Sequence, residues 1–231
     1  MIQINNLKKS YGQTTVLSID NLEILTSDVI GLIGNNGAGK TTLFSLILDL
    51  IEPTCGIVIN KGVVVSQSEL WKKHTTAFID ESFLIGYLTP EEYFYFVGNL
   101  RGMNKGDVDD FLSQHTEFFN NEIIGGKKYI RDLSKGNQKK VGIIAAFMGN
   151  PELVILDEPF ANLDPTTQIR LKHIITHYNN KHKTTILISS HDLNLTVDVV
   201  TRVLILEKGN LIKDTFKTEN TLQELETFFA V

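Results

Sequence analysis

Apolar residues occur along the chain in short runs separated by polar turns, a pattern typical of proteins rich in β-strands. Residues 29–33 read VIGLI and residues 153–156 read LVIL, and unbroken apolar runs of this kind are typical of strands buried on both faces. The pattern predicts a helix over about 41–50 and strands at 2–7, 15–25, 28–33, 56–65, 76–80, 152–157, 184–190 and 202–213. The last range holds two strands joined by the turn Lys-Gly-Asn at 208–210.

Helices alternate with the later strands, so a parallel α/β core is the natural architecture, and the earliest strands add antiparallel pairs. Strand patterns stop between about 88 and 140. Residues 89–92 read TPEE, a capping box with proline at the first helical position, and the spacing that follows predicts an apolar helix face. The residues of that face are Tyr93, Phe96, Val97 and Leu100. We therefore expect a single domain over 1–231 with an inserted, mostly helical lobe at about 88–140.

Composition narrows the class of protein. With 231 residues, of which 42% are hydrophobic, the chain can fill one substantial core, and its net charge of −5 disfavours nucleic-acid binding. Cys55 is the only cysteine, which excludes an intrachain disulfide and a zinc cluster of several cysteines. Residues 1–12 lack an apolar signal core, and the most apolar stretch, 43–51, is about half a membrane span. These features predict a cytoplasmic chain that does not itself cross a membrane.

Residues 34–42 read GNNGAGKTT and follow the apolar run 29–33, the spacing and place of a Walker A phosphate-binding loop. Its glycines let the backbone fold closely around an anion, and the amides of 37–42 can point at phosphate oxygens. Lys40 is expected to reach the β- and γ-phosphates, and the Thr41 hydroxyl to bind Mg²⁺. The nucleotide-binding residues predicted in this loop are Gly34, Asn35, Asn36, Gly37, Ala38, Gly39, Lys40, Thr41 and Thr42.

Residues 153–158 read LVILDE, an apolar strand that ends in two carboxylates. Open α/β sheets bind ligands at the carboxyl ends of their strands, where these two side chains stand. We predict that Asp157 is the Walker B carboxylate that holds Mg²⁺, directly or through water. Glu158 is expected to polarise the attacking water as a general base, so Glu158 and Lys40 are predicted catalytic residues.

Residues 133–138 read LSKGNQ and resemble the LSGGQ signature of ATP-binding-cassette (ABC) proteins, about 20 residues before Asp157. Ser134 and the amide of Gly136 lie just before the apolar helix predicted at 141–148, which suits the binding of an anion at a helix start. In the family this resemblance indicates, the anion is the γ-phosphate of ATP held by the opposing subunit. Ser134 and Gly136 are therefore added to the expected nucleotide-binding residues.

The same resemblance gives roles to three further places. Tyr11 matches the aromatic residue that stacks on adenine, although a turn aromatic can also pack locally. Residues 161–164, ANLD, resemble the D-loop that crosses the dimer interface, while Asp164 can also cap the helix that Pro165 opens. His191 in the sequence SSHD matches the switch histidine that contacts the γ-phosphate and is predicted to be catalytic.

The resemblance extends from Tyr11 to His191, and the chain is identified as similar to ABC-transporter ATP-binding subunits. The implied fold is α/β: a P-loop NTPase core of mixed sheet with helices, an antiparallel β subdomain and an inserted helical lobe. The forms LSKGNQ, IGYLTPEEYF at 85–94 and LRGM at 100–103 resemble the exporter-type group, in which the ATPase is a chain separate from its membrane protein.

The family implies a head-to-tail dimer that holds two Mg-ATP molecules, each between the phosphate loop of one subunit and the signature of the other. The expected partners are a second ATP-binding subunit, with a homodimer favoured, and a polytopic membrane permease, and no nucleic acid is expected. Hydrolysis of ATP to ADP and phosphate would drive transport, with the chain peripheral on the inner face of the cell membrane.

Three positions depart from the family pattern. Lys135 and Asn137 replace a glycine and a glutamine of the signature, which leaves Ser134 and Gly136 in place. The Q-loop glutamine is expected after the strand at 76–80, where Glu81 is the best candidate and could reach Mg²⁺ or water. Gln67 precedes the strand at 76–80 and lies in a predicted hairpin, so it does not fit the position of the Q-loop glutamine and is expected to be a surface residue.

Two alternative functions remain open at this point. One is a soluble ABC-type ATPase of DNA maintenance or translation, but the sequence has no sustained heptad pattern and no second cassette. The other is a nucleotide-sensing module with little turnover, which the presence of both Glu158 and His191 argues against.

Overall fold

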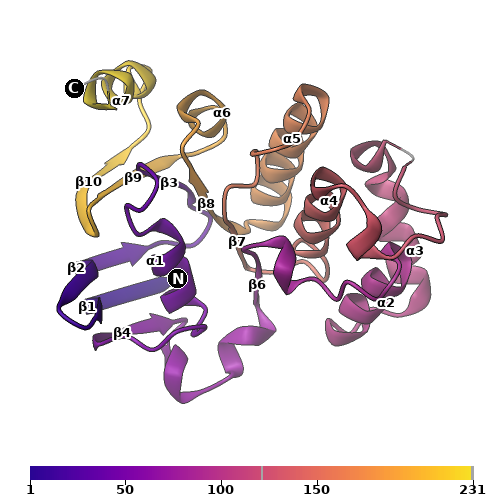
Figure 1. Cartoon of the computed structure of the whole chain (residues 1–231), viewed down its shortest axis with the longest axis horizontal. Helices are drawn as coiled ribbons and strands as arrows, with labels where there is room; N and C mark the ends of the chain where they lie inside the picture. Colours follow the sequence, from indigo (N-terminus) through magenta and orange to yellow (C-terminus); the bar gives the residue numbers. More distant parts are fainter. Residues whose placement is uncertain (121, 230–231) are drawn as a thin grey trace.

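One mixed β-sheet organises the molecule in the computed structural model, which describes residues 1–120 and 122–229 (Figure 1). Within these residues the sheet has ten strands in the order β5-β4-β1-β2-β10-β9-β3-β8-β7-β6. Four neighbouring strands pair only in parallel: β3 (Val29–Ile33), β8 (Thr185–Ser190), β7 (Leu153–Leu156) and β6 (Thr75–Phe78). β9 (Arg202–Glu207) pairs parallel with β3 and antiparallel with β10 (Asn210–Phe216).

The other end of the sheet is antiparallel. It contains β1 (Ile2–Tyr11), β2 (Thr14–Ile24), β4 (Cys55–Asn60) and the short β5 (Val63–Val64). The predicted strand at 56–65 is therefore two strands around a turn, and the first strand runs four residues beyond the predicted 2–7. Strand β1 continues to Tyr11 because it forms a hairpin with β2, in which Tyr11 lies opposite Thr14.

The seven helices of the described chain lie on both sides of this sheet. They are α1 (Lys40–Ile47), α2 (Pro90–Leu100), α3 (Lys105–Gln114), α4 (Lys135–Ala145), α5 (Pro165–His182), α6 (Leu193–Val197) and α7 (Thr221–Phe229). Figure 1 shows α2, α3 and α4 gathered at the end of the molecule far from β1 and β2. This region contains helices and the 3₁₀ turns η4 (Thr116–Phe119) and η5 (Ile130–Asp132), as expected from the loss of strand patterns. A further 3₁₀ turn, η3 (Glu81–Phe83), precedes the predicted lobe.

The parallel strands separate two hydrophobic cores. In β7, Val154 and Leu156 belong to the core shared with the helical end, whereas Leu153 and Ile155 belong to the core shared with α1 and the antiparallel strands. Both faces of the strand are therefore covered, which explains why its sequence is continuously apolar. The predicted fold class, an α/β P-loop core with an antiparallel part and a helical lobe, is confirmed.

The start of α2 is as predicted, but its buried face is not. Thr89 and Glu92 form a reciprocal capping box, with Thr89 N–H donating to Glu92 Oε2 at 2.8 Å. Phe94 and Gly98 are buried, whereas Phe96 is 45% and Leu100 70% exposed, so the prediction of a face containing Phe96 and Leu100 was wrong. Tertiary packing determines which face of α2 is buried. Gly98 has no side chain, and Val108 and Met148 occupy the space where a Cβ would lie.

Two other helices differ from their predicted limits. α1 ends at Ile47 rather than near 50. α4 begins at Lys135, six residues before the predicted 141, because Ser134 caps it and the polar residues of the signature form its first turns. It ends at Ala145 rather than 148.

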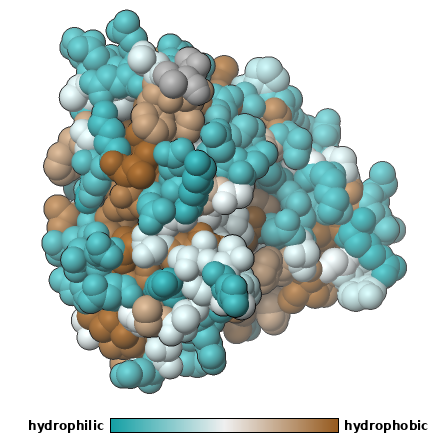
Figure 2. All heavy atoms as spheres, turned by 60° about the vertical axis from the view of Figure 1, so that its left-hand side comes forward, coloured by the Kyte–Doolittle hydropathy of each residue, from teal (hydrophilic) through white to brown (hydrophobic). Residues whose placement is uncertain are grey.

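The surface contains scattered apolar groups. On the face shown in Figure 2, hydrophilic side chains predominate and hydrophobic ones form separate small groups. Such exposure is normal for a folded domain. Among the described residues, none of the helices has both the length and the hydrophobicity needed to cross a bilayer.

Candidate active site

The predicted phosphate loop, residues 34–42, connects β3 to α1 and depends on its glycines. A Cβ on Gly34 would collide with the backbone oxygen of Leu206 in β9. Gly37 and Gly39 have φ values of +80° and +106°, in the region that favours glycine. Asn35 and Asn36 are exposed, Ala38 is buried and Thr42 is half-buried. The sequence thus builds a tight turn whose outer rim faces solvent.

The first turn of α1 is suited to an anion. Its N-cap is Gly39, which provides no side-chain cap, so the amides of the first turn have no side-chain partner from that position. Lys40 is buried, with 7% of its surface exposed, and Nζ donates to the oxygen of Gly34 at 2.6 Å. The ammonium group therefore lies across the loop, next to the amides that would hold a phosphate.

Three parallel strands bring the other predicted residues to the same edge. Strands β3, β8 and β7 are neighbours, and the loop, His191 and Asp157 follow their respective carboxyl ends. Thr41 Oγ1 donates to Asp157 Oδ2 at 2.5 Å, which joins the two Walker motifs. Asp157 is 6% exposed, and this burial raises the pKa of its carboxyl, while hydrogen bonds from Ser189 and Thr41 oppose that shift.

Glu158 is held at both its backbone and its side chain. Its φ is +45°, unusual for a residue with a side chain, and its N–H donates to Ser189 Oγ at 2.8 Å. One carboxylate oxygen, Oε1, lies 3.3 Å from Lys40 Nζ, and the other, Oε2, lies 2.8 Å from Nδ1 of His191. Glu158 therefore contacts both of the other residues predicted to be catalytic, Lys40 and His191, and does so from a left-handed backbone conformation.

Two residues in this cluster had no role in the sequence analysis. Ser189, the last but one residue of β8, donates to Asp157 Oδ1 and accepts from the Glu158 amide. Lys139 on α4 donates to the backbone oxygen of Glu158 at 3.0 Å and is only 6% exposed. Burial lowers the pKa of the Lys139 ammonium, against the raising effect of nearby carboxylates. The pair Ser189-Ser190 just before His191 gave a local signal, whereas Lys139 gave none, because its contact depends on how α4 packs.

The side chains at this edge fit a magnesium ion that is also bound by phosphate. Within residues 1–120 and 122–229, no group of three or more His, Cys, Asp or Glu side chains is arranged to hold a metal. Thr41 and Asp157 supply two adjacent oxygens, the hard ligands that Mg²⁺ prefers. Mg²⁺ is commonly held by one or two protein oxygens plus substrate phosphates, and this donor set has that form.

The signature lies at the start of α4. Ser134 is its N-cap and accepts a hydrogen bond from the Asn137 amide at 3.2 Å. A Cβ at Gly136 would come within 3.1 Å of the backbone oxygen of Asn162 in the D-loop. Asp164 caps α5 by accepting from Thr167 N–H at 3.0 Å, as predicted. The signature and the D-loop are therefore packed against each other.

The remaining predicted residues lie farther out. Tyr11 is 57% exposed at the end of β1, and Lys9 Nζ lies 4.8 Å from its ring centroid. Glu81, in η3 after β6, places Oε1 3.9 Å from Lys139 Nζ. Gln67 is exposed after the β4–β5 hairpin, as expected of a surface residue. Glu81 thus contacts a buried lysine of α4, a partner that the sequence did not indicate.

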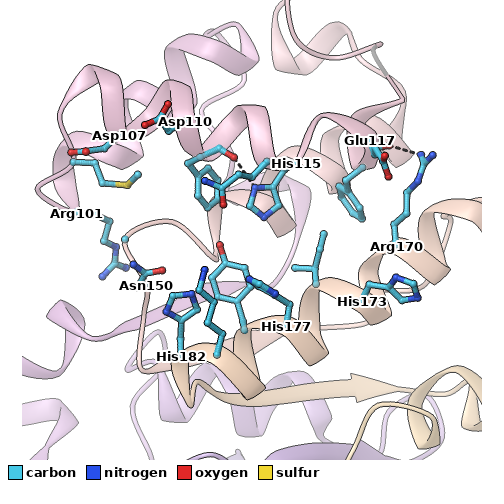
Figure 3. A pocket seen from close by; sticks show the side chains of 18 of the residues that line it. Arg101, Asp107, Asp110, His115, Glu117, Asn150, Arg170, His173, His177 and His182 are labelled. Atoms are coloured by element: carbon cyan, nitrogen blue, oxygen red, sulfur yellow. Dashed lines mark hydrogen bonds between the residues drawn. The ribbon is translucent and has the colours of Figure 1, made fainter.

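A cavity of about 800 Å³ is lined by other residues, mainly from α3, η4 and α5 (Figure 3). It contains four of the six histidines of the chain: His115, His173, His177 and His182. Figure 3 shows His115 on one side of the cavity and His177 and His182 on the other. Nδ1 of His115 lies 2.7 Å from the backbone oxygen of Phe111, and burial lowers the pKa of this imidazole. None of the predicted catalytic residues lines this cavity.

Comparison with known proteins gives consistent matches. The family model described as ABC transporter matches residues 17–161. An uncharacterized ABC transporter ATP-binding protein of Methanocaldococcus jannaschii is 34% identical over 224 residues, covering 91% of this chain and 76% of that protein. The bacitracin transport ATP-binding protein BcrA of Enterococcus faecalis is 33% identical over 221 residues, covering 93% of this chain and 68% of that protein.

A solved structure has the same fold. It is an ATP-binding cassette in a dimeric, post-hydrolysis state bound to ADP and Pi. Its TM-score is 0.83 at 22% identity, and the match covers 94% of this chain and 98% of that one.

Proposed function

Since the chain belongs to the ABC transporter family, as an ATP-binding subunit that hydrolyses ATP, we propose that the cluster around Glu158 is its hydrolytic site. The subunit drives transport through a membrane-spanning partner on a separate chain. This assignment rests on the position of the Glu158 carboxylate, which lies 3.3 Å from Lys40 Nζ and 2.8 Å from His191 Nδ1.

Each residue of the cluster has a distinct task in this proposal. Lys40 and the first amides of α1 bind the β- and γ-phosphates. Thr41 and Asp157 hold Mg²⁺, which when bound neutralises charge on the phosphate oxygens. Asp157 is positioned for this by Ser189 and Thr41, which both donate to its carboxylate.

Glu158 acts as the general base. It takes a proton from water as the water oxygen bonds to the γ-phosphorus, and the bond from that phosphorus to the β–γ bridging oxygen breaks, which gives ADP and phosphate. His191 holds one carboxylate oxygen through Nδ1 and so fixes the direction in which the other can act. The left-handed backbone at Glu158 supports the same orientation.

The signature of each cassette acts on the ATP held by a second cassette, and the two copies are arranged head to tail. Ser134 and Gly136 stand at the N-terminal end of α4, and the D-loop packs beside them, so both elements present their ends to the same region. The solved relative with this fold is dimeric, which favours such an assembly. Tyr11, exposed at the end of β1, is placed against adenine in this proposal.

The membrane partner docks between the sheet and the helical lobe. A cavity of about 320 Å³ lies there, lined by residues of β6, α2 and α4, and Phe83 at its edge is 61% exposed. The exporter-type assignment rests on the segments 85–94 and 100–103 and on the signature form. In this arrangement the chain is peripheral on the inner face of the cell membrane.

The proposal is tested by purification from the native cell. The tagged chain is expected to co-purify from mild detergent with a polytopic membrane protein in fixed ratio, identified by mass spectrometry, and the complex is expected to hydrolyse ATP. A second cassette that differs in sequence would replace the homodimer by a heterodimer. Recovery with soluble proteins or nucleic acid alone would contradict the transport assignment.

A further inference from the structure

Lys139 occupies an unusual place for a lysine. It lies on α4, five positions after Ser134, and is 6% exposed, although lysine side chains are almost never fully buried unless they are paired. Its Nζ donates to the backbone oxygen of Glu158 at 3.0 Å and lies 3.9 Å from Oε1 of Glu81. The side chain of Glu81 is itself 16% exposed. The ammonium group therefore connects two acidic residues far apart in the sequence.

Lys139 contacts the main chain of Glu158, so it can restrain the backbone conformation of Glu158 as well as change the local charge. Glu158 has a φ of +45°, and its amide is fixed by Ser189 Oγ at 2.8 Å. Lys139 fixes the carbonyl on the other side of the same residue. With both peptide groups restrained, the backbone is held in a conformation that is costly for a residue with a side chain and from which the carboxylate reaches Lys40 and His191.

Glu81 balances the charge of Lys139. Burying an ammonium group without a counter-ion is costly, and Glu81 is the carboxylate that lies within ion-pair distance of it. Its neighbour Asp80 and the aromatic Phe83 line the cavity between β6, α2 and α4. The pair thus stands between that cavity and the backbone of Glu158.

On the basis of the hydrolytic site proposed above, we propose that Lys139 is a positioning residue for Glu158, and that Glu81 acts as the counter-ion of Lys139 rather than as a ligand of Mg²⁺. Lys139 touches no residue of the phosphate loop in the described contacts. It is thus expected to affect the rate of hydrolysis and to leave nucleotide affinity unchanged.

The test uses the full chain and a neutral exchange of the pair. In Lys139→Gln, an amide can still donate a hydrogen bond, but Glu81 loses its counter-ion and becomes an unpaired carboxylate near Glu158. We expect kcat to fall about 100-fold, the order of loss that a misplacement of about 1 Å can cause, with unchanged Kd for ATP by calorimetry. In the double variant Glu81→Gln and Lys139→Gln, both charges are gone, and kcat and the melting temperature are expected to recover most of the loss.

Controls separate this inference from the site on which it rests. Lys172→Met removes a partly buried lysine that is paired with Asp198 on another part of the surface, and is expected to keep the wild-type kcat. If the wild type neither binds nor hydrolyses ATP, the proposed function itself fails. If the wild type hydrolyses ATP and Lys139→Gln stays within twofold of its kcat, the positioning role is refuted.

Two further outcomes decide the role of Glu81. Additive effects of Glu81→Gln and Lys139→Gln, with no recovery in the double variant, would overturn the counter-ion assignment. A rise in the Mg²⁺ concentration needed for half-maximal activity in Glu81→Gln would do the same, because losing a metal ligand weakens Mg²⁺ binding. If Lys139→Gln does not fold, Lys139→Arg serves instead: it keeps the charge and is expected to keep at least a tenth of the wild-type kcat, and a complete loss in that folded variant contradicts the proposal.

Discussion

His191 Nδ1 lies 2.8 Å from Glu158 Oε2, so the first residue after β8 contacts the second residue after β7. The strands are parallel neighbours, with Leu156 paired to Ile188, which brings their carboxyl ends together. A histidine and a glutamate 33 positions apart therefore form one unit at the sheet edge.

Replacement of Glu158 by Gln is expected to lower kcat for ATP hydrolysis by about 100- to 10,000-fold, the range that general-base catalysis contributes. The amide keeps a similar shape, so ATP affinity is expected to be unchanged and the ATP-bound dimer to live longer. Steady-state phosphate release and size-exclusion chromatography with ATP measure the two effects. Wild-type turnover in this variant would contradict the assignment of the base.

Lys40→Ala is expected to weaken ATP binding by about 10- to 100-fold, which corresponds to the roughly 1.5–3 kcal/mol of a hydrogen bond to a charged group. Isothermal titration calorimetry gives the Kd. Lys61→Ala provides the control, because Lys61 is an exposed lysine whose ion pair is with Glu152. If both variants bind ATP with the same Kd, Lys40 does not bind the phosphates.

Thr41→Ala removes the hydroxyl that lies 2.5 Å from Asp157 Oδ2. We expect a loss of affinity for ATP in the presence of Mg²⁺ and little loss in the presence of EDTA, since the hydroxyl serves the metal. Thr41→Ser retains the oxygen and is expected to bind as the wild type does. The same loss with and without Mg²⁺ would show that Thr41 contacts the nucleotide instead.

Gly142→Ala is expected to destabilise the fold by about 1–3 kcal/mol, the usual cost of overpacking. A Cβ at this position of α4 would collide with the ring of Phe78 in β6, so the helix that carries the signature would be displaced from the sheet. At Gly126 the nearest atom to an added Cβ is 3.8 Å away, and Gly126→Ala is expected to be close to neutral. Urea unfolding of both variants makes the comparison.

His115 is expected to make the protein less stable in acid. Burial lowers its pKa in the folded state below the ordinary value of about 6.5, so the unfolded chain binds more protons in the interval between the two values. The free energy of unfolding therefore falls as pH drops from about 6.5 toward the folded pKa.

The check is unfolding at a series of pH values, with His115→Asn as the comparison. The variant is expected to show a shallower acid slope, whatever its stability at neutral pH. The slope does not vanish, because burial also lowers the pKa of His74 and His182. An identical slope in both proteins, or an NMR titration of His115 near 6.5, would contradict the expectation.

Local sequence patterns predicted the elements that carry the chemistry. VIGLI and LVIL are apolar throughout because β3 and β7 are covered on both faces, and the loop 34–42 follows β3 as its glycines require. The sequence assigned both Thr41 and Asp157 to Mg²⁺, and the structure places Thr41 Oγ1 2.5 Å from Asp157 Oδ2. These inferences depend on neighbouring residues along the chain.

Contacts between distant segments could not be predicted in the same way. The apolar face of α2 was assigned from spacing alone, but Gly98 is buried because α3 approaches there, and Phe96 is left outside. Lys139 reads as a surface lysine until the packing of α4 places it beside the Glu158 carbonyl. In both cases the contact is made with a residue on another helix or loop. Local sequence patterns do not show which distant segments pack together.

The neighbours of strand β3 are synthesised long after β3 itself. β3 pairs with β8 and β9, which are completed only by residues 185–207. The phosphate loop is enclosed from the same direction, with Gly209 N–H donating to the oxygen of Ala38 at 2.9 Å. On a ribosome, a nascent chain that stops before residue 185 therefore has a phosphate loop without its supporting strands. Nucleotide can therefore meet a complete phosphate site only after residues 185–209 have been made.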